Sequence, residues 1–375
     1  MGEIYYNPTK IIIDKSYECL DKLLKENSEK RILILCSNNF LKRNKMFSHL
    51  FNRQKNVLVY NNVQNNPDIN YIYDVLQDLN DKKIEYIIAI GGGSIIDTGK
   101  AVATFNQLDI KNQDELRKYI IEKKYLSNKY FIPIAAIPTT AGTGSEVTSW
   151  ATVWDMDNEK KYSIACDKLY PQKAIIDPSL TTTLPMKLTA STGLDALTHA
   201  VESYWAKASN SISKMYATKA IGLVIEALPD LLEELGNSRL REKMMLASLY
   251  AGLAFSNTKT TACHSISYPL TMKYNIPHGI AVSITLAEVM ELNTSHMQGF
   301  DILINAFKVK NTKDVQNFIT SICNRADIKY RLRDYGVARE DILDIVHRSY
   351  TKGRMDNNPR DLTKQQIEIM LTNLL

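Results

Sequence analysis

Apolar runs alternate with amphipathic segments along the first half of the chain. Runs rich in β-branched and aliphatic residues predict strands at positions 31–36, 55–60, 86–90 and 131–137. Between them, residues 69–79 and 94–105 repeat their apolar positions with the period of a helix. Strands that are apolar at nearly every position are buried on both faces, which is typical of a parallel sheet covered by helices. The pattern therefore predicts an α/β domain whose sheet is mostly parallel.

The pattern changes after Pro185. Strand-like runs end there, and long amphipathic stretches follow at positions 211–228, 239–254, 314–326 and 364–375. A segment rich in Pro and Thr, residues 177–185, separates the two patterns. We therefore expect an α/β domain over residues 1–182 and an all-helical domain over residues 183–375.

The composition is that of an ordinary globular protein, since 45% of the 375 residues are hydrophobic and 23% are charged. The net charge of +5 is spread along the chain without a basic block, so the sequence does not indicate nucleic-acid binding. The five cysteines are scattered and form no CxxC pair, which fits a reducing compartment. No apolar run approaches the roughly 20 residues of a membrane span. We expect a cytoplasmic protein that does not insert in a membrane.

Two strand ends carry loops suited to a nucleotide. The predicted strand 86–90 runs into Gly91-Gly92-Gly93-Ser94, where glycines let the backbone approach a ligand and the free amides of a helix start attract a pyrophosphate. The strand 131–137 runs into residues 138–148, PTTAGTGSEVT, which are rich in hydroxyls and small side chains. Read separately, the first is also compatible with a tight turn and the second with a surface loop. Two such loops at the strand ends of one sheet favour a dinucleotide site.

The few histidines allow every spacing to be considered. Asp195 and His199 are four residues apart in STGLDALTHAVESYW and so share one face of a helix. His264 lies in a second predicted helix and His278 in the turn Ile-Pro-His-Gly. One Asp and three His can hold Fe²⁺ or Zn²⁺ and leave a position for a substrate oxygen, although each histidine alone could be an ordinary core or surface residue. The remaining histidines lie in polar surroundings and are interpreted as surface residues: His49, His296 and His347.

These motifs resemble a known family. GGGSIIDTGKA, PTTAGTGSEVT, STGLDALTHAVESYW and the IPHG turn, in this order, are similar to the iron-containing (group III) alcohol dehydrogenases, and the resemblance extends to Asn358-Pro359-Arg360. It implies the dehydroquinate synthase-like fold of that family, with a dinucleotide-binding domain, a helical domain, and a metal held between them by Asp195, His199, His264 and His278. It also implies a homodimer in which Fe²⁺ or Zn²⁺ polarises an aldehyde oxygen while NADPH or NADH supplies hydride.

The resemblance places the cofactor along both loops. The predicted cofactor-binding residues are Asn38, Gly92, Gly93, Ser94, Asp97, Thr139, Thr140, Thr143, Thr148 and Lys161. Family members that prefer NAD tend to place an Asp after the first strand of this domain, where it repels a 2′-phosphate. This chain has Cys-Ser-Asn-Asn at positions 36–39 instead. We therefore predict that NADPH is used at least as well as NADH.

The predicted catalytic residues are His264, Tyr268, Lys259, Thr260 and Thr261, and most of them depart from the family pattern. Tyr268 stands where most members have a second histidine, so we expect it to orient substrate or pass a proton. If residues 260–264 are helical, the hydroxyls of Thr260 and Thr261 face the metal, with Lys259 as a nearby cation for an oxyanion. The alternative is that Lys259 extends into solvent and the threonines cap a helix.

The segment TKTTACHSISYPLT resembles the phosphonoacetaldehyde reductase (2-hydroxyethylphosphonate dehydrogenase) branch of the family, which implies a small aldehyde that carries a phosphonate as substrate. Three alternatives stay open. A short-chain alcohol, diol or lactaldehyde would keep the class and change the substrate. A dehydroquinate synthase-like lyase would need a denser basic set and a different ligand pattern. A non-catalytic metal- or nucleotide-binding module would bind cofactor without oxidising it.

Overall fold

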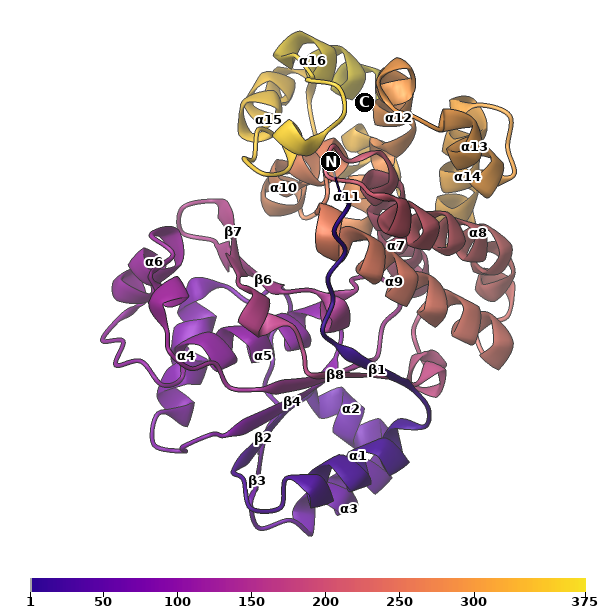
Figure 1. Ribbon diagram of the computed structural model, residues 1–375. Helices are drawn as coiled ribbons and strands as arrows, with labels where there is room; N and C mark the ends of the chain where they lie inside the picture. Colours follow the sequence, from indigo (N-terminus) through magenta and orange to yellow (C-terminus); the bar gives the residue numbers. More distant parts are fainter. Residues whose placement is uncertain (1) are drawn as a thin grey trace. The chain divides into compact units, whose positions relative to one another are not determined.

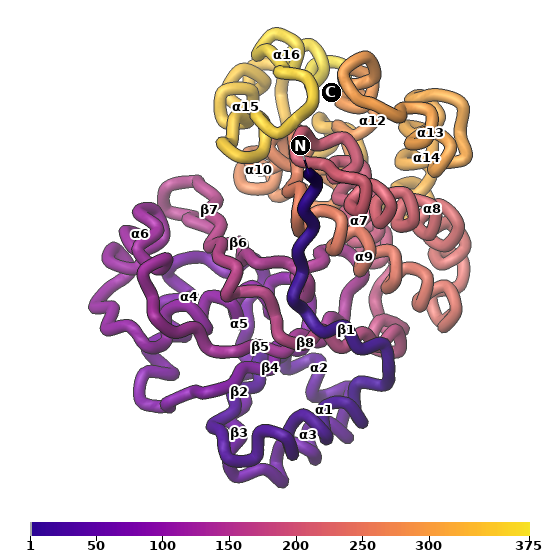
Figure 2. Tube along the Cα trace, in the orientation of Figure 1, coloured from indigo at the N-terminus to yellow at the C-terminus, as the bar shows by residue number. Residues whose placement is uncertain are grey.

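The computed structural model describes residues 2–375, and the chain packs as two compact units (Figure 1). The sheet unit consists of Asn7–Thr140 and Ser145–Leu180, and the helical unit of residues 2–6, Ala141–Gly144 and Thr181–Leu375. Figure 2 follows the trace from the indigo and magenta sheet unit to the rose and yellow helical unit. The expected boundary at 182/183 lies two residues from the observed break, but the sequence does not reveal that residues 2–6 and 141–144 pack with the helices.

The sheet unit is built on six parallel strands in the order β1-β8-β5-β4-β2-β3. Their bounds are β1 Lys10–Ile13, β2 Ile32–Leu35, β3 Val57–Tyr60, β4 Tyr86–Gly91, β5 Ile134–Pro138 and β8 Lys173–Ile176. The four predicted strands are confirmed, although β5 begins three residues later than expected. In the register of β4 and β5, Gly91 is paired with Pro138, so the two glycine- and threonine-rich loops leave the same edge of the sheet side by side.

Helices cover both faces of this sheet, as the apolar strands predict. On one face, strand residues such as Ile34 and Ile88 pack against α1 (Ser16–Glu26), α2 (Asn38–Arg43) and α3 (Lys45–Asn52). On the other, Leu33 and Ile87 pack against α4 (Ile69–Leu79), α5 (Gly93–Phe105) and α6 (Gln113–Ile121). A separate antiparallel hairpin joins β6 (Trp150–Asp155) to β7 (Lys160–Ala165).

From Met186 onward, the elements that the structure describes are helices. They are α7 (Met186–Trp205), α8 (Ser211–Glu233), α9 (Ser238–Thr258), α10 (Ala262–Tyr274), α11 (His278–Ile284), α12 (Leu286–Asn293), α13 (Phe300–Phe307), α14 (Thr312–Arg325), α15 (Ile342–Arg348) and α16 (Lys364–Asn373). Short 3-10 turns complete the chain: η1 (Lys124–Ser127), η2 (Ser145–Val147), η3 (Asp167–Leu169), η4 (Pro178–Thr181), η5 (Thr294–His296), η6 (Leu332–Tyr335), η7 (Arg339–Asp341) and η8 (Met355–Asn357). The fold class predicted from the sequence is confirmed.

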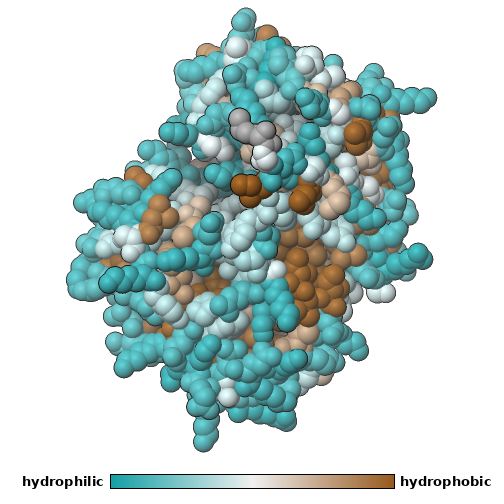
Figure 3. Space-filling model, viewed as in Figure 1, coloured by the Kyte–Doolittle hydropathy of each residue, from teal (hydrophilic) through white to brown (hydrophobic). Residues whose placement is uncertain are grey.

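The long amphipathic stretches of the sequence all lie within helices, but their ends moved. The largest change is α8, which continues to Glu233 through Pro229 instead of ending at residue 228. Within the described part of the chain, none of the helices is long and apolar enough to cross a membrane. The face of the molecule seen in Figure 3 is mainly hydrophilic, in keeping with the high content of charged residues.

Candidate functional site

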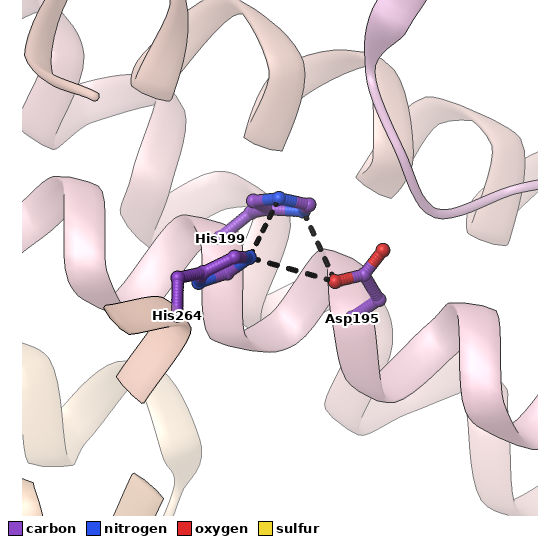
Figure 4. Close-up of side chains that lie close together, drawn as sticks. All are labelled: Asp195, His199 and His264. Carbon is purple, nitrogen blue, oxygen red and sulfur yellow. Dashed lines mark hydrogen bonds and ion pairs between the residues drawn. The ribbon is translucent and has the colours of Figure 1, made fainter. Parts of the chain in front are cut away.

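Three of the four predicted metal ligands converge inside the helical unit. Asp195 and His199 lie one turn apart on α7, and His264 reaches the same point from α10 (Figure 4). Asp195 Oδ1 is 3.6 Å from His199 Nδ1 and 3.7 Å from His264 Nε2, and the two Nε2 atoms are 3.0 Å apart. All three side chains are buried. The helical spacing read from the sequence thus brings these groups to one point.

The fourth predicted ligand, His278, opens α11 and lies at the edge of this cluster. Its Nε2 is 4.0 Å from Asp195 Oδ1, and its ring centroid is 5.4 Å from that of His264. The next residue, Gly279, explains how the turn comes so close to α7, because a Cβ there would lie 1.9 Å from the carbonyl oxygen of Ser191. Only glycine fits at this contact. The structure therefore brings three of the predicted ligands together and places His278 at the edge of that group.

The hydrogen bonds of the cluster leave its centre suited to a cation. The His199 Nδ1–H donates to the Gly142 carbonyl at 3.3 Å, and the His264 Nδ1–H donates to Glu202. With both Nδ1 atoms protonated, both Nε2 atoms offer lone pairs to the same point. Asp195 Oδ1 is buried there without a hydrogen-bond partner among residues 2–375. Imidazole nitrogens and a carboxylate oxygen in this arrangement fit Fe²⁺ or Zn²⁺.

The electrostatics of the cluster agree with this fit. Burial lowers the pKa of His199 to about 4 despite the attraction of Asp195, so this ring stays neutral at physiological pH. Burial also opposes the charge of His264, but the carboxylates of Glu202 and Asp195 together raise its pKa to about 9. The surrounding imidazoles hold the pKa of Asp195 below its ordinary value in spite of burial. The two carboxylates therefore stabilise positive charge at the centre, whether a proton or a metal ion supplies it.

Glu202 is a buried carboxylate beside this cluster that the sequence reasoning missed. It lies on α7 three residues after His199 and is fully buried. Its Oε2 faces His264 Nδ1 in a close contact, and its Oε1 accepts a hydrogen bond from Thr261. The signal was present in the sequence, because positions 195, 199 and 202 share one face of a helix. Only the position of α10, which no local pattern gives, shows that this carboxylate meets a predicted ligand.

The two strand-end loops predicted to bind the cofactor lie side by side in the sheet unit. The Thr139 N–H donates to the Gly91 carbonyl at 3.1 Å, and a Cβ on Gly92 would meet the Thr140 hydroxyl at 3.2 Å. Helix α5 begins at Gly93 directly after this turn, with an extended Gly92 as its N-cap. Glycine at position 92 therefore favours close packing of the two loops, because a Cβ there would displace the Thr140 side chain slightly. The free amides at this helix start remain our predicted site for the pyrophosphate.

Two of the predicted cofactor residues, Asp97 and Thr148, form hydrogen bonds inside the protein. Asp97 accepts a hydrogen bond from the Ser145 hydroxyl at 2.6 Å and from the Thr152 N–H at 2.9 Å. The Thr148 hydroxyl is 3.2 Å from Nζ of Lys100, which is completely buried beneath this loop. These contacts hold the loop in shape. Asp97 and Thr148 are therefore placed to support the loop from within, a role that the sequence did not indicate.

The remaining predicted cofactor residues are spread over the fold. Asn38 is exposed at the first position of α2, and Ser94 accepts a hydrogen bond from the Asn66 N–H at 3.2 Å. Lys161, on β7, lies 5.3 Å above the Trp154 ring. Thr143 belongs to the segment Ala141–Gly144, which packs with the helical unit and not with the sheet. The motif 138–148 is therefore divided between the two units, and its contact with a nucleotide stays a prediction.

Residues 260–264 do not form one continuous helix, so the condition under which Thr260 and Thr261 would face the metal is not met. α9 ends at Thr258, Lys259 adopts a left-handed φ of +63°, and α10 begins only at Ala262. Thr261 is the N-cap residue of α10, and its hydroxyl accepts from Trp205 and donates to Glu202, so it does not face the metal position. Lys259 is exposed, and Thr260 is buried in the turn between the helices. Tyr268 lies one helical turn beyond His264 on α10, as predicted, and is buried.

The structure adds a second cation beside the segment that leads to His264. The amide of Asn357 donates to the carbonyls of Thr258 and Thr260, at 2.8 and 3.1 Å, on both sides of Lys259. The Thr351 N–H donates to the Ser265 hydroxyl at 2.9 Å. Both ends of the loop 351–357 are thereby tied to residues 258–265, and half-buried Arg354 lies in the middle of that loop. No motif in the sequence pointed to this residue.

The three histidines outside the cluster are exposed, as predicted. His49 lies on α3, His296 in η5 and His347 on α15. None of them is among the described residues that could hold a metal together. Two of the six histidines therefore belong to the group of possible metal ligands, and His278 lies at its edge.

Comparisons with known proteins agree with this arrangement. The family model "iron-containing alcohol dehydrogenase" matches residues 8–178, and the model for the C-terminal part of that family matches residues 189–375. An NADPH-dependent butanol dehydrogenase from Clostridium saccharobutylicum is 29% identical over 92% of both chains. Lactaldehyde reductase from Escherichia coli K12 is 32% identical over 82% of both chains. The structure of sulfoacetaldehyde reductase from Bifidobacterium kashiwanohense in complex with NAD⁺ is 30% identical, with a TM-score of 0.88 over 100% of this chain and 99% of that chain.

Proposed function

We propose that this chain, which belongs to the iron-containing alcohol dehydrogenase family, reduces phosphonoacetaldehyde to 2-hydroxyethylphosphonate. As a member of that family it is a metal-dependent alcohol dehydrogenase or aldehyde reductase that uses NAD(P). The proposal therefore concerns the substrate. A small aldehyde that carries an oxyanion needs cationic groups beside the reacting carbonyl, whereas a short-chain alcohol, diol or lactaldehyde does not.

The observation that carries the proposal is the pair of cations beside the His264 segment. Lys259 stands at the turn between α9 and α10, and Arg354 lies in the loop that Asn357 ties to both sides of that turn. A planar guanidinium and a flexible ammonium together suit the three oxygens of a phosphonate. The solved relative that reduces sulfoacetaldehyde, a sulfonate, supports an anionic aldehyde of this size.

The reduction itself requires a hydride donor, a group that polarises the carbonyl and a proton donor. Hydride from NAD(P)H forms a bond to the carbonyl carbon, the carbonyl π bond breaks, and a proton completes the alcohol. A metal held by Asp195, His199, His264 and His278 would polarise the carbonyl oxygen. Tyr268, one turn beyond His264, is proposed to orient the substrate or pass the proton; a Tyr268→Phe enzyme with an unchanged rate would remove it from this role.

The decisive experiment measures NADPH oxidation by the purified protein loaded separately with Fe²⁺ and with Zn²⁺. Phosphonoacetaldehyde, lactaldehyde and butanal are compared through kcat/KM. We expect phosphonoacetaldehyde to exceed both others by at least about tenfold, because charge-assisted hydrogen bonds are worth roughly 1.5–3 kcal/mol. A preference for butanal or lactaldehyde would establish the alternative substrate class, and no oxidation with any aldehyde would favour a binding module.

Single variants localise the effect. We expect Arg354→Gln and Lys259→Ala each to lower kcat/KM about 10- to 100-fold for phosphonoacetaldehyde and much less for butanal. Lys352→Ala removes an exposed charge from the same loop as Arg354 and is the matched control. Equal losses with both aldehydes would mean that the two cations support the fold and not the phosphonate.

Three further features belong to this proposal. The expected homodimer is tested by light scattering of the metal-loaded protein, and the expected cytoplasmic location by fractionation of cells that produce it. Residues Gly92, Gly93, Ser94, Thr139 and Thr140 are proposed to hold the cofactor pyrophosphate, because glycines and hydroxyls meet there at the start of α5.

A further inference from the structure

Glu202 has no role in the ligand set, yet it is the most completely enclosed carboxylate beside that set. Its side chain has no exposed area, and it lies on α7, the helix that also carries Asp195 and His199. A buried carboxylate is expensive unless its oxygens receive hydrogen bonds. The partners of each oxygen therefore show what this residue does.

One oxygen is occupied by the start of α10. Glu202 Oε1 accepts from the Thr261 hydroxyl at 2.8 Å, the Cys263 N–H at 2.7 Å and the His264 N–H at 3.4 Å. A carboxylate at this position is also favoured by the positive end of the helix dipole. Glu202 thus caps α10 from a different helix and fixes the backbone from which His264 projects.

The direction of the Thr261 hydrogen bond is determined by Trp205. The indole Nε1–H of Trp205 can only donate, and it donates to the Thr261 hydroxyl at 2.8 Å. The oxygen of Thr261 accepts that bond, so its own hydrogen is directed at Glu202. Both hydrogen bonds therefore point the same way: Trp205 donates to Thr261, and Thr261 donates to the Glu202 carboxylate.

The other oxygen faces His264. Glu202 Oε2 is in close contact with His264 Nδ1, which must therefore carry a hydrogen and donate it. That leaves Nε2 of His264 as the atom directed at Asp195 and His199. A ligating histidine needs its second nitrogen held in this way if the ring is to keep one tautomer and one orientation.

We propose that Glu202 is a positioning residue that fixes the tautomer and orientation of His264, so that His264 Nε2 is preorganised as a metal ligand. Thr261 holds Glu202 in place through its hydroxyl, and Trp205 in turn orients that hydroxyl. The inference rests on the proposed metal-dependent function, but it concerns metal binding and not turnover. It also gives Thr261 a role in holding Glu202, whereas the sequence interpretation directed its hydroxyl at the metal.

The test is Glu202→Gln, read as metal affinity. In the variant the amide NH₂ must face His264 Nδ1 and donate to it, because the amide oxygen is required by the Cys263 N–H and Thr261. His264 is then driven to carry its hydrogen on Nε2, which blocks ligation. We expect the dissociation constant for Zn²⁺, measured by competition with a chromophoric chelator, to rise about 10- to 100-fold. The visible spectrum of the Co²⁺-loaded protein should change as well.

Matched variants keep the test decisive. Glu146→Gln makes the same change at another buried glutamate, in the sheet unit, and should leave the Zn²⁺ affinity unchanged. Thr261→Val removes only the hydroxyl that joins Trp205 to Glu202 and should weaken Zn²⁺ binding several-fold. Thr261→Ser keeps that hydroxyl and should bind Zn²⁺ as tightly as the wild type. These milder variants answer the question if Glu202→Gln fails to fold.

The six histidines allow a direct spectroscopic check. In a long-range ¹H–¹⁵N NMR spectrum of the Zn²⁺-loaded protein, His264 should carry its hydrogen on Nδ1 alone. A His264 that carries it on Nε2 would overturn the proposal, as would Glu202→Gln and Thr261→Val proteins that bind Zn²⁺ as tightly as the wild type. A wild-type protein that binds neither Zn²⁺ nor Co²⁺ would instead contradict the metal-dependent function itself, so the two failures are distinguishable.

Discussion

The polar cluster around Lys100 in the sheet unit and the cluster around Asp195 in the helical unit differ in whether their hydrogen bonds form a closed network. In the sheet unit, Lys100 Nζ donates to the carbonyls of Ser145, Thr148 and Trp150 at 2.7, 2.7 and 2.8 Å. Asp97 accepts two further bonds, from the Ser145 hydroxyl and from the Thr152 N–H on β6. In the helical unit, a chain of hydrogen bonds connects Trp205 through Thr261 and Glu202 to His264 Nδ1. It ends there, and His264 Nε2 faces His199 Nε2 and Asp195 Oδ1.

The difference distinguishes buried polar groups that stabilise the fold from buried polar groups that can bind a ligand. A closed cluster satisfies its own donors and acceptors, so it shapes a loop and needs nothing more. An open cluster leaves Asp195 Oδ1 and two imidazole nitrogens around a point that only a cation can satisfy. Both clusters contain buried charged groups, Lys100 in one and Asp195 and Glu202 in the other. A structural cluster has a hydrogen-bond partner for each of its acceptors, whereas a ligand site leaves acceptor atoms facing a common point.

The largest expected effect comes from removing a ligand of the open cluster. We expect His264→Ala to lower kcat/KM for the preferred aldehyde at least about 10³-fold, since loss of metal polarisation costs several kcal/mol of transition-state stabilisation. Metal content, measured by atomic absorption, should fall with it. His296→Ala removes an exposed histidine from the same unit and should change neither quantity. A His264→Ala protein that keeps its metal and its rate would show that the open cluster is not the site.

The closed cluster should respond in stability and not in metal binding. Lys100→Met leaves the three carbonyls without their shared donor and removes the positive charge near Asp97. We expect the free energy of unfolding, measured with urea, to fall by about 3–5 kcal/mol, the range found when one partner of a buried charged network is removed. Metal affinity of the folded protein should stay the same. Lys118→Met, at an exposed position of α6, is the control. A loss of metal without a loss of stability would reverse our assignment of the two clusters.

A buried glutamate near the closed cluster gives the comparison a pH dependence. Glu146 is buried, and its Oε1 has no hydrogen-bond partner within the described chain. Burial raises the pKa of Glu146 to about 7 although Lys100 lies near. A raised pKa in the folded state means that stability is fully present below the ordinary value of about 4.5 and is lost as pH rises through about 7.

Replacing Glu146 by Gln removes this ionisation. We therefore expect Glu146→Gln to raise the free energy of unfolding by about 1–3 kcal/mol at pH 8, where the carboxylate is charged, and to change it little at pH 4. Urea unfolding at the two pH values measures the difference. A variant that is equally affected at both would show that the pKa of Glu146 is not raised in the folded protein.

The sequence predicted the parts of these clusters that are local in the chain. Helical spacing placed Asp195 and His199 on one face of α7, and the apolar period predicted α4 at its observed residues, 69–79. Both features depend on residues a few positions apart. The same spacing contained Glu202, but a carboxylate on a helix face has many uses, and its partner is 62 residues away.

What the sequence did not predict depends on packing between distant segments. Strands β1 and β8 are four residues each and become visible only through their pairing. The segment Ala141–Gly144 reads as part of a nucleotide loop, yet Gly144 packs against Gly252, where a Cβ would lie 2.5 Å from the Gly252 Cα. Thr261 was placed on a helix because its spacing from His264 fits one, whereas its contacts with Trp205 and Glu202 keep it outside.

The smallest expected effect lies away from both clusters, at the end of β2. Asn38 is exposed at the start of α2, its N–H donates to the Asn61 carbonyl at 3.1 Å, and Ser37 caps the helix through the Phe40 N–H. No carboxylate stands at positions 36–39 to repel a 2′-phosphate, so we predict that NADPH is used at least as well as NADH.

Asn38→Asp introduces that carboxylate with almost no change in shape. A negative charge at the first position of α2 is also tolerated by the helix dipole, so the variant should fold normally. We expect the ratio of kcat/KM for NADPH to that for NADH to fall about tenfold, which corresponds to roughly 1.4 kcal/mol. Asn52→Asp makes the same change at the far end of α3 and should leave the ratio unaltered. If Asn38→Asp also leaves it unaltered, position 38 does not face the ribose, and the preference between the two cofactors is set elsewhere in the sheet unit.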